Sequence, residues 1–202
     1  MEAFMMTLSS GVVSGVRPYL MLFVLGLSGR LLEIHEIPQV MQRTDVLVIA
    51  AVLVIVDFLA DKVQFLDSVW DGINTFVRPV AGGAIGFLLG GETDTTTAVL
   101  YAIVGTGAAL GTHGAKAATR AAVNVSPEPV SNVLVSVIED VVAVVLAILA
   151  VLLPILAGIA AVFILIAAIV AIVVLVRFVR KWRARREAKN GAVPEGTAPT
   201  LR

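Results

Sequence analysis

The chain lacks cysteine and is poor in charged residues, histidine and aromatic residues. Its 202 residues include no Cys, two His, 15% charged residues and 6% aromatic residues. Without cysteine there is no disulfide, thiolate metal site or cysteine nucleophile, and two distant histidines argue against a histidine-rich metal site. Because 15 Lys and Arg balance 15 Asp and Glu, the basic domain typical of nucleic-acid binding is missing.

Apolar residues are what the chain has in abundance. They make up 58% of it, and the mean hydropathy is +0.97. An average soluble domain is roughly 45–50% apolar and about 25% charged. The composition therefore predicts an all-α fold, a polytopic transmembrane helix bundle.

The apolar runs predict about six membrane spans. A helix of about 20 apolar residues crosses a hydrocarbon core, and suitable runs occupy about 5–28, 45–61, 66–90, 95–113, 130–153 and 155–178. Pro154 separates the last two runs, so we expect it in a tight turn between two helices. We predict one transmembrane domain over 1–189, followed by a disordered cytoplasmic tail over 190–202, which is rich in Gly, Pro and small residues.

The basic residues predict the orientation. Positively charged residues favour the cytoplasmic side of a membrane protein. Twelve of them would lie on one side, namely Lys62, Arg78, Lys116, Arg120, Arg177, Arg180, Lys181, Arg183, Arg185, Arg186, Lys189 and Arg202; only Arg30 and Arg43 would lie on the other. We therefore expect a cytoplasmic C-terminus and, after six spans, a cytoplasmic N-terminus.

A short repeat indicates where helices are interrupted. Val16-Arg17-Pro18 recurs as Val77-Arg78-Pro79, and each is followed by an apolar run that ends in glycine. The two copies predict parallel repeat units, about 5–76 and 77–130, each with an interrupted Arg-Pro helix and a polar elbow, followed by helices 130–153 and 155–178. Interrupted helices at matching positions point to the binding site of a transporter. Alternatively, the tripeptide match is fortuitous and Arg17 or Arg78 reaches the membrane interface.

Two polar stripes end the second and fourth predicted spans. Steps of three or four residues place side chains on one helix face. The first stripe contains Asp57, Asp61, Gln64, Ser68 and Asp71, with Lys62 beside it; the second contains His113, Lys116, Arg120 and Asn124. We expect Asp57 or Asp61 to pair with Lys116 or Arg120, because opposite charges at equal depth are buried most cheaply together. Such pairing would be either structural or part of a site for a cation.

A third polar feature lies in the run 130–153. Glu139-Asp140 stand about ten residues inside it, roughly 15 Å deep, where a carboxylate is a functional-site candidate. One of the two should face the interior of the bundle, near Asp57 or the second stripe. Before this run, Ser126-Pro127-Glu128-Pro129 and Asn132 predict a helix N-cap or an anion site at helix-terminal amides. Glycines at four-residue spacing in 82–90 and 107–111 predict close helix packing.

These motifs resemble those of a known family. The segments Phe58-Leu59-Ala60-Asp61-Lys62, Trp70-Asp71 with Val77-Arg78-Pro79, Thr112-His113 with Lys116-Ala117-Ala118-Thr119-Arg120, Ser126-Pro127-Glu128-Pro129 with Ser131-Asn132, and Glu139-Asp140 carry the resemblance. Over roughly 10–155 the chain resembles an uncharacterised bacterial integral-membrane family, a domain of unknown function. The resemblance implies a multi-span inner-membrane protein and no particular reaction. The family's proline near Gln64 is absent, so its elbow should be less sharp here.

Three functions are compatible with this pattern. The first is a small transporter or channel for an ion or small polar solute, which explains interrupted helices and acids at depth. The second is a non-catalytic scaffold or assembly factor, and the third an enzyme or binder of phospholipid head groups. Asp71-Gly72 alone is too weak a lipid-transferase motif, and neither a zinc motif nor a Ser-His-Asp set is present, so we expect no cofactor. Partners compatible with the sequence are the bilayer, a second copy of the chain, and a cation, a proton or a lipid phosphate.

The basic C-terminal segment should lie in the cytoplasm, where anionic lipids attract Lys and Arg by about 1 kcal/mol per residue near the surface. A cysteine placed at Asn190 should react with a membrane-impermeant thiol reagent only after the cells are opened. The cysteine-free parent protein is the control. Labelling in intact cells would reverse the orientation.

Overall fold

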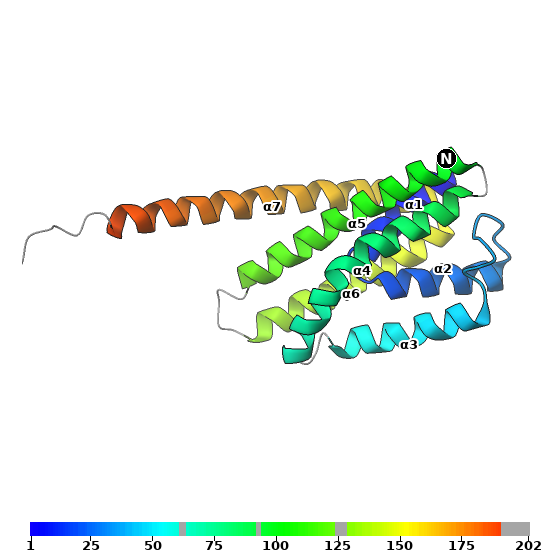
Figure 1. Ribbon diagram of the computed structural model, residues 1–202, viewed down its shortest axis with the longest axis horizontal. Helices are drawn as coiled ribbons and strands as arrows, with labels where there is room; N and C mark the ends of the chain where they lie inside the picture. Colours follow the sequence, from blue (N-terminus) through cyan, green and yellow to red (C-terminus); the bar gives the residue numbers. More distant parts are fainter. Residues whose placement is uncertain (61–63, 92–93, 124–128, 191–202) are drawn as a thin grey trace, which may run out of the picture.

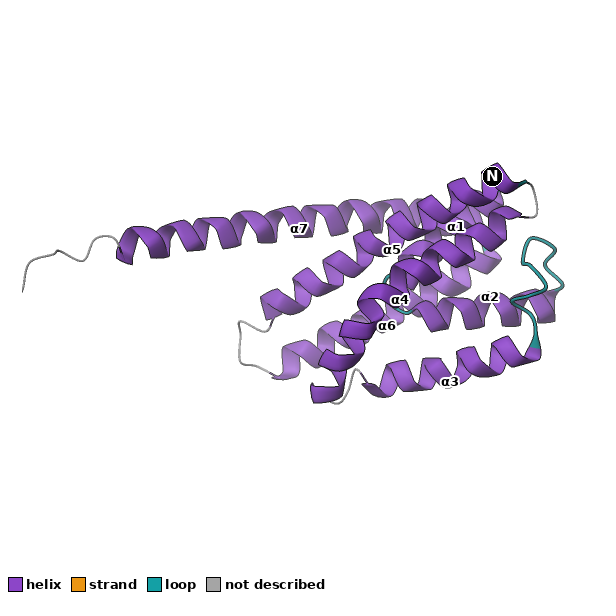
Figure 2. Ribbon diagram, in the orientation of Figure 1, coloured by secondary structure: helices purple, strands orange, loops and turns teal. Residues whose placement is uncertain are grey.

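Most of the part of the chain that the structure describes is helical. The computed structural model describes residues 1–60, 64–91, 94–123 and 129–190, and these form seven helices and no strand (Figure 2). The helices are α1 (Glu2–Ser14), α2 (Pro18–Leu32), α3 (Thr44–Ala60), α4 (Gln64–Gly91), α5 (Thr95–Val123), α6 (Pro129–Leu152) and α7 (Pro154–Asn190). The all-α fold class predicted from composition is confirmed.

The apolar character of the helices matches a membrane bundle. Among the described residues, three helical segments are long and apolar enough to cross a membrane: Val69–Gly91, Thr95–Thr119 and Pro154–Trp182. The segment Pro18–Leu32 is apolar but shorter. The protein is therefore a helical membrane protein, as the hydropathy predicted.

The prediction that residues 5–28 form one membrane-spanning helix is wrong. This segment is broken into α1 and α2, with Arg17 in an extended conformation (φ −139°, ψ 77°) between them. Pro18 causes the break, because it has no N–H and disfavours the helical conformation at the preceding residue. With 13 and 15 residues, the two helices are about 20 and 22 Å long, too short to cross a core of about 30 Å.

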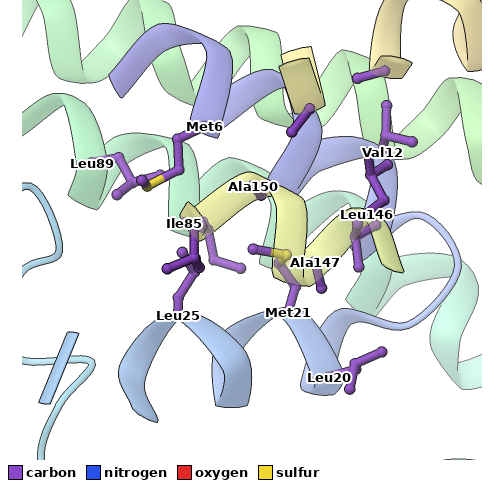
Figure 3. Close-up of a cluster of buried hydrophobic side chains, with 14 of the residues drawn as sticks. Met6, Val12, Leu20, Met21, Leu25, Ile85, Leu89, Leu146, Ala147 and Ala150 are labelled. Carbon is purple, nitrogen blue, oxygen red and sulfur yellow. The ribbon is translucent and has the colours of Figure 1, made fainter. Parts of the chain in front are cut away.

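The two short helices form a hairpin that turns back inside the bundle. In Figure 3, the direction from Met6 to Val12 along α1 is opposite to the direction from Leu20 to Leu25 along α2. As a result, the N-terminus lies at the opposite end of the long axis from the end of α7 (Figure 1). The prediction that both termini are cytoplasmic assumed one uninterrupted first span, and the hairpin removes that basis.

A hydrophobic cluster surrounds the hairpin and fixes its position. Met21 and Leu25 of α2 are fully buried, and they pack with side chains of α1, α4 and α6 (Figure 3). The labelled members of this cluster are Met6, Val12, Leu20, Met21, Leu25, Ile85, Leu89, Leu146, Ala147 and Ala150. Burying an aliphatic side chain of this size is worth about 1.5–3 kcal/mol, although in a bilayer close packing replaces part of that term.

Glycines let α1, α4 and α5 approach one another closely. The spacing in 82–90 predicted this packing correctly, whereas the prediction is wrong at Gly107, where a Cβ atom meets nothing within 4 Å. A Cβ atom added at Gly82 of α4 would lie 2.7 Å from the carbonyl oxygen of Gly105 and 2.8 Å from Cβ of Ala109 in α5. A Cβ atom at Gly11 of α1 would also lie 2.7 Å from the Gly105 oxygen. Helices α1 and α4 therefore both contact the backbone at Gly105 of α5. A larger residue at Gly11 or Gly82 would push its own helix away from α5.

The remaining helix ends follow local chemistry. Asp94 precedes α5 and accepts hydrogen bonds from the hydroxyl (2.6 Å) and the amide (3.0 Å) of Thr97. The hydrogen bond from the Thr97 side chain and, to a smaller extent, the one from its amide hold the pKa of Asp94 below its usual range.

Leu153 separates α6 from α7, so the predicted turn at Pro154 is confirmed. Helix α7 continues through its basic segment to Asn190, beyond the expected end at 178. The predicted tail over 190–202 is therefore wrong at its first residue, and 191–202 lie outside the described residues.

The glycine contacts can be tested by adding one methyl group. Gly82→Ala should lower the free energy of unfolding in detergent by about 1–3 kcal/mol, because the new Cβ overpacks α5. Gly107→Ala on α5 is the matched control, since a Cβ atom there meets nothing within 4 Å. Thermal unfolding followed by circular dichroism measures both. Equal stability of the two variants would show that α4 and α5 do not meet at Gly82.

Candidate functional site

The tip of the α1–α2 hairpin places an arginine inside the bundle. Arg17 is only 1% exposed, and its guanidinium pairs with acids from two other helices. Its Nη1 donates to Oδ2 of Asp57 on α3 at 2.8 Å, while Nε and Nη2 donate to Oδ1 of Asp140 on α6 at 2.8 and 2.6 Å. The guanidinium carbon also lies 4.6 Å from the ring centroid of Phe58, a cation–π distance. One cation therefore connects the hairpin, α3 and α6.

Helix α4 supplies a second set of partners to Asp57. The indole N–H of Trp70 donates to Oδ1 of Asp57 at 2.7 Å, and the Asn74 amide donates to the same oxygen at 3.3 Å. The Asn74 oxygen in turn accepts a hydrogen bond from the Tyr19 hydroxyl at 3.3 Å. Arg17, Trp70 and Asn74 therefore bond both carboxylate oxygens of Asp57.

A second buried arginine lies on α4. Arg78 has no exposed surface; its Nη2 lies 3.0 Å from Oδ1 of Asp71, and its Nη1 lies 2.8 Å from Nδ1 of His113 on α5. Since arginine can only donate, Nδ1 accepts, which makes His113 neutral with its proton on Nε2. Snorkelling of Arg78 to the interface is therefore excluded. Its Nε is buried without a hydrogen-bond partner among the described residues.

A third ion pair joins α5 to α6. Nζ of Lys116 lies 3.7 Å from Oε2 of Glu139. Both side chains line a cavity of about 280 Å³ between α1, α5, α6 and α7. Because Glu139 and Asp140 are adjacent, α6 presents one acid to Lys116 and the other to Arg17. The prediction that one of them faces the interior near Asp57 is confirmed, since Asp140 and Asp57 share Arg17.

Of the predicted pairs between Asp57 or Asp61 and Lys116 or Arg120, the pair of Asp57 with Lys116 is wrong, and the pairs that involve Asp61 or Arg120 lie outside the described side chains. Asp57 is bonded to Arg17, Trp70 and Asn74 instead, because the hairpin brings Arg17 to its depth. Among the described members of the two stripes, Asp71 and His113 are joined through Arg78 rather than by a direct ion pair. Asp71 contacts Arg78 of its own helix, while His113 is directed to α4 and Lys116 to α6.

Several predicted site residues are not placed. Asp61, Lys62, Asn124 and Glu128 lie outside the described residues, and the side chains of Arg120 and Asn132 lie outside the described side chains. Three residues that belong to the hydrogen-bond network of Asp57 were not predicted from the sequence, namely Trp70, Asn74 and Tyr19. Trp70, Asn74 and Arg78 recur at four-residue steps, and this spacing on one face of α4 was the available signal.

The two Arg-Pro segments share one geometric property. Arg17 contacts Asp57, 40 residues later, and Arg78 contacts His113, 35 residues later, so each arginine contacts the next long helix of its unit. However, Arg17-Pro18 breaks the helix, whereas Pro79 lies inside the continuous α4. The internal repeat stays a prediction, and only its first copy contains the expected interruption.

The described part of the cluster contains three cations and four acids. Its described members are Arg17, Arg78 and Lys116 with Asp57, Asp71, Glu139 and Asp140, around the neutral His113. Buried charges at membrane depth are expensive and mark ion or substrate pathways. The arrangement can bind a cation or a proton in competition with an arginine, and the Arg78 Nε can donate to a polar ligand.

Comparison with known proteins identifies the family. A family model described as a domain of unknown function (DUF4126) matches residues 4–174, so the chain belongs to this family, and the resemblance inferred from the motifs is confirmed. No curated protein and no solved structure matches the chain.

The Arg17 network should contribute strongly to stability. Arg17→Gln leaves two carboxylates buried without their cation, which should cost about 3–5 kcal/mol of unfolding free energy. Arg43→Gln is the matched control, because Arg43 and its partner Asp45 are 64% and 57% exposed and such pairs are worth about 0–1 kcal/mol. Chemical denaturation in detergent compares them. A loss of the same size in both variants would contradict a buried network.

Proposed function

We propose that this membrane protein transports an ion or a small polar solute, and that the charge cluster at the hairpin tip is its binding site. The observation that supports this most is the position of Arg17, at the break between two half-helices and between acids of α3 and α6. Non-helical backbone at membrane depth is tolerated where it is buried in protein or lines a cavity, and discontinuous helices recur at transporter sites.

The cost of the cluster supports a function beyond packing. Well-packed apolar residues of similar volume usually stabilise a protein as well as a buried ion pair does. The chain nevertheless keeps a guanidinium of 1% exposure with Asp57, also 1% exposed, inside an otherwise apolar bundle. Charges that are expensive for folding are explained most simply by a charged cargo or coupling ion.

The ion pairs also provide a mechanism. Arg17 holds α3 and α6 together through separate carboxylates. A cation or proton that binds Asp140 weakens its attraction to Arg17, so α6 is released while Asp57 keeps the arginine. A carboxylate that loses its arginine attracts a cation or accepts a proton, so the competing species at Asp140 is a cation or a proton rather than an anion.

The orientation of the cluster is part of the proposal. Lys116 stands three residues before the end of the segment Thr95–Thr119, about 5 Å along the helix. The basic part of α7 extends from the same end of the bundle (Figure 1). With this end in the cytoplasm of a bacterial cell, the site opens toward the cytoplasm, and the N-terminus lies on the other side of the inner membrane.

A scaffold without a substrate is the second candidate. It is favoured by the bonding of Arg17, whose three nitrogens all donate to acids. In this case the same ion pairs only hold the hairpin to α3 and α6. The two functions differ in one measurable property, the permeability of vesicles that contain the purified protein.

Transport is tested with proteoliposomes. Wild-type protein should accelerate flux of at least one of H⁺, Na⁺ and K⁺, followed with a pH-sensitive dye and ion-selective electrodes. Asp140→Asn should reduce that flux about 10- to 100-fold, the effect of losing a hydrogen bond to a charged group. Asp45→Asn is the matched control, because Asp45 is exposed and paired with the exposed Arg43.

Two results would decide against the proposal. In the first, vesicles that contain the wild-type protein are no more permeable than protein-free vesicles to any of these ions or to a panel of small polar solutes. The second is unchanged flux in an Asp140→Asn protein that assembles normally, which would place any pathway away from Arg17. Absence of flux together with failed assembly of Asp140→Asn would favour the scaffold.

A further inference from the structure

The cavity beside the charge cluster has the layout of an amphiphile site. It measures about 280 Å³, close to the lower limit of roughly 300–1,000 Å³ for small-molecule sites. Most of its lining is apolar, from Val12 and Val16 at the hairpin, Leu146 on α6 and Ile164 on α7. Its charged lining residues are Lys116 and Glu139, with Thr112 and Thr119 as neighbouring hydroxyls.

The polar and apolar parts of the cavity are separated along the helices. Glu139 and Leu146 are seven residues apart on α6, as are Ala171 and Ile164 on α7. Seven residues correspond to about 10 Å along a helix. The ion pair therefore lies toward the end from which the basic part of α7 extends, and the apolar part lies deeper. A membrane lipid has the same order, with its head group near the surface and its acyl chain deeper.

The charges define the head group. Lys116 is 3% exposed and Glu139 is 20% exposed at the side chain, and their atoms are 3.7 Å apart, longer than the roughly 2.7–2.9 Å of a charge-assisted hydrogen bond. A phosphate can accept from the ammonium while a primary amine donates to the carboxylate. A fatty-acid carboxylate or a phosphoglycerol head group is disfavoured, because it is repelled by the negative charge of Glu139 and has no amine to donate to it. A choline head group is disfavoured because its ammonium has no N–H to donate.

We propose that this cavity binds an aminophospholipid, with its phosphate on Lys116, its ammonium on Glu139 and part of one acyl chain between α5, α6 and α7. This site uses the Lys116 and Glu139 end of the charge cluster, and lipid binding there does not depend on the proposed transport. It adjoins the Arg17 end, because Glu139 precedes Asp140 on α6. A bound lipid would therefore fix the part of α6 that holds Arg17.

The probe is phosphatidylethanolamine with a diazirine in its acyl chain, added to the full-length protein in vesicles. After photolysis, mass spectrometry should locate the label on cavity-lining residues of α5, α6 or α7. Phosphatidylglycerol and phosphatidylcholine with the same labelled chain should react about tenfold less, the ratio that corresponds to one hydrogen bond to a charged group.

Two kinds of variant test the cavity and the head-group contact separately. Ala168→Leu, or Ala143→Leu from the opposite wall, fills the cavity with both charges retained and should abolish the specific label. Val170→Leu is the control, because Val170 is exposed on α7 and is not among the cavity-lining residues. Glu139→Gln keeps the side-chain shape, and phosphatidylethanolamine should then react no more than phosphatidylglycerol.

Three outcomes would overturn the proposal. Equal labelling of wild type by all three lipids would show no head-group recognition. Labelling that survives Ala168→Leu and Ala143→Leu would place the lipid outside the cavity. Preference for phosphatidylglycerol in the wild type would identify an anionic lipid bound to Lys116 alone. None of these outcomes depends on whether the vesicles transport ions.

Discussion

The ion pairs of Arg17 with Asp57 and Asp140 are the interaction on which the arrangement of the bundle depends. They are made by one guanidinium, and they join a hairpin tip to two helices that are distant in sequence. In an apolar surrounding a charge without a partner is expensive, so the arginine and its two acids each fix the place of the others. The hairpin turns back at the depth where its charge is neutralised.

Close packing gives this electrostatic centre its geometry. The hairpin reaches Asp57 only because α1 lies against α5 with Gly11 on the Gly105 backbone, and α4 lies against the same residue through Gly82. The small residues bring backbones together, and the resulting short distances bring Arg78 to His113. Packing and charge therefore act on the same helices, and a change in one displaces the other.

Helix α6 connects the two polar regions of the protein. Its consecutive acids, Glu139 and Asp140, point to different neighbours, the first to Lys116 at the cavity and the second to Arg17 at the hairpin tip. Since adjacent helical residues are about 100° apart, a rotation or shift of α6 moves both contacts together. A ligand at the cavity and an ion at the hairpin tip would thus compete for or stabilise the same position of this helix.

The sequence alone determined that this is an all-helical membrane protein, that Pro154 separates two helices, that glycines of 82–90 pack helices closely and that one acid of Glu139-Asp140 faces the interior of the bundle. Each follows from composition or from local spacing. The sequence also contains Pro18, which ends one helix and begins the next. The apolar residues on both sides of Pro18 nevertheless predicted a single span, because hydropathy does not distinguish a helix that crosses the membrane from two helices that turn back inside it. Only the tertiary structure decided that Arg17, rather than Lys116, is the partner of Asp57. The physical reason is that an ion pair depends on which side chains share a depth and face each other, and this is set by the packing of α1, α3 and α6, not by the residues next to Arg17 in the chain.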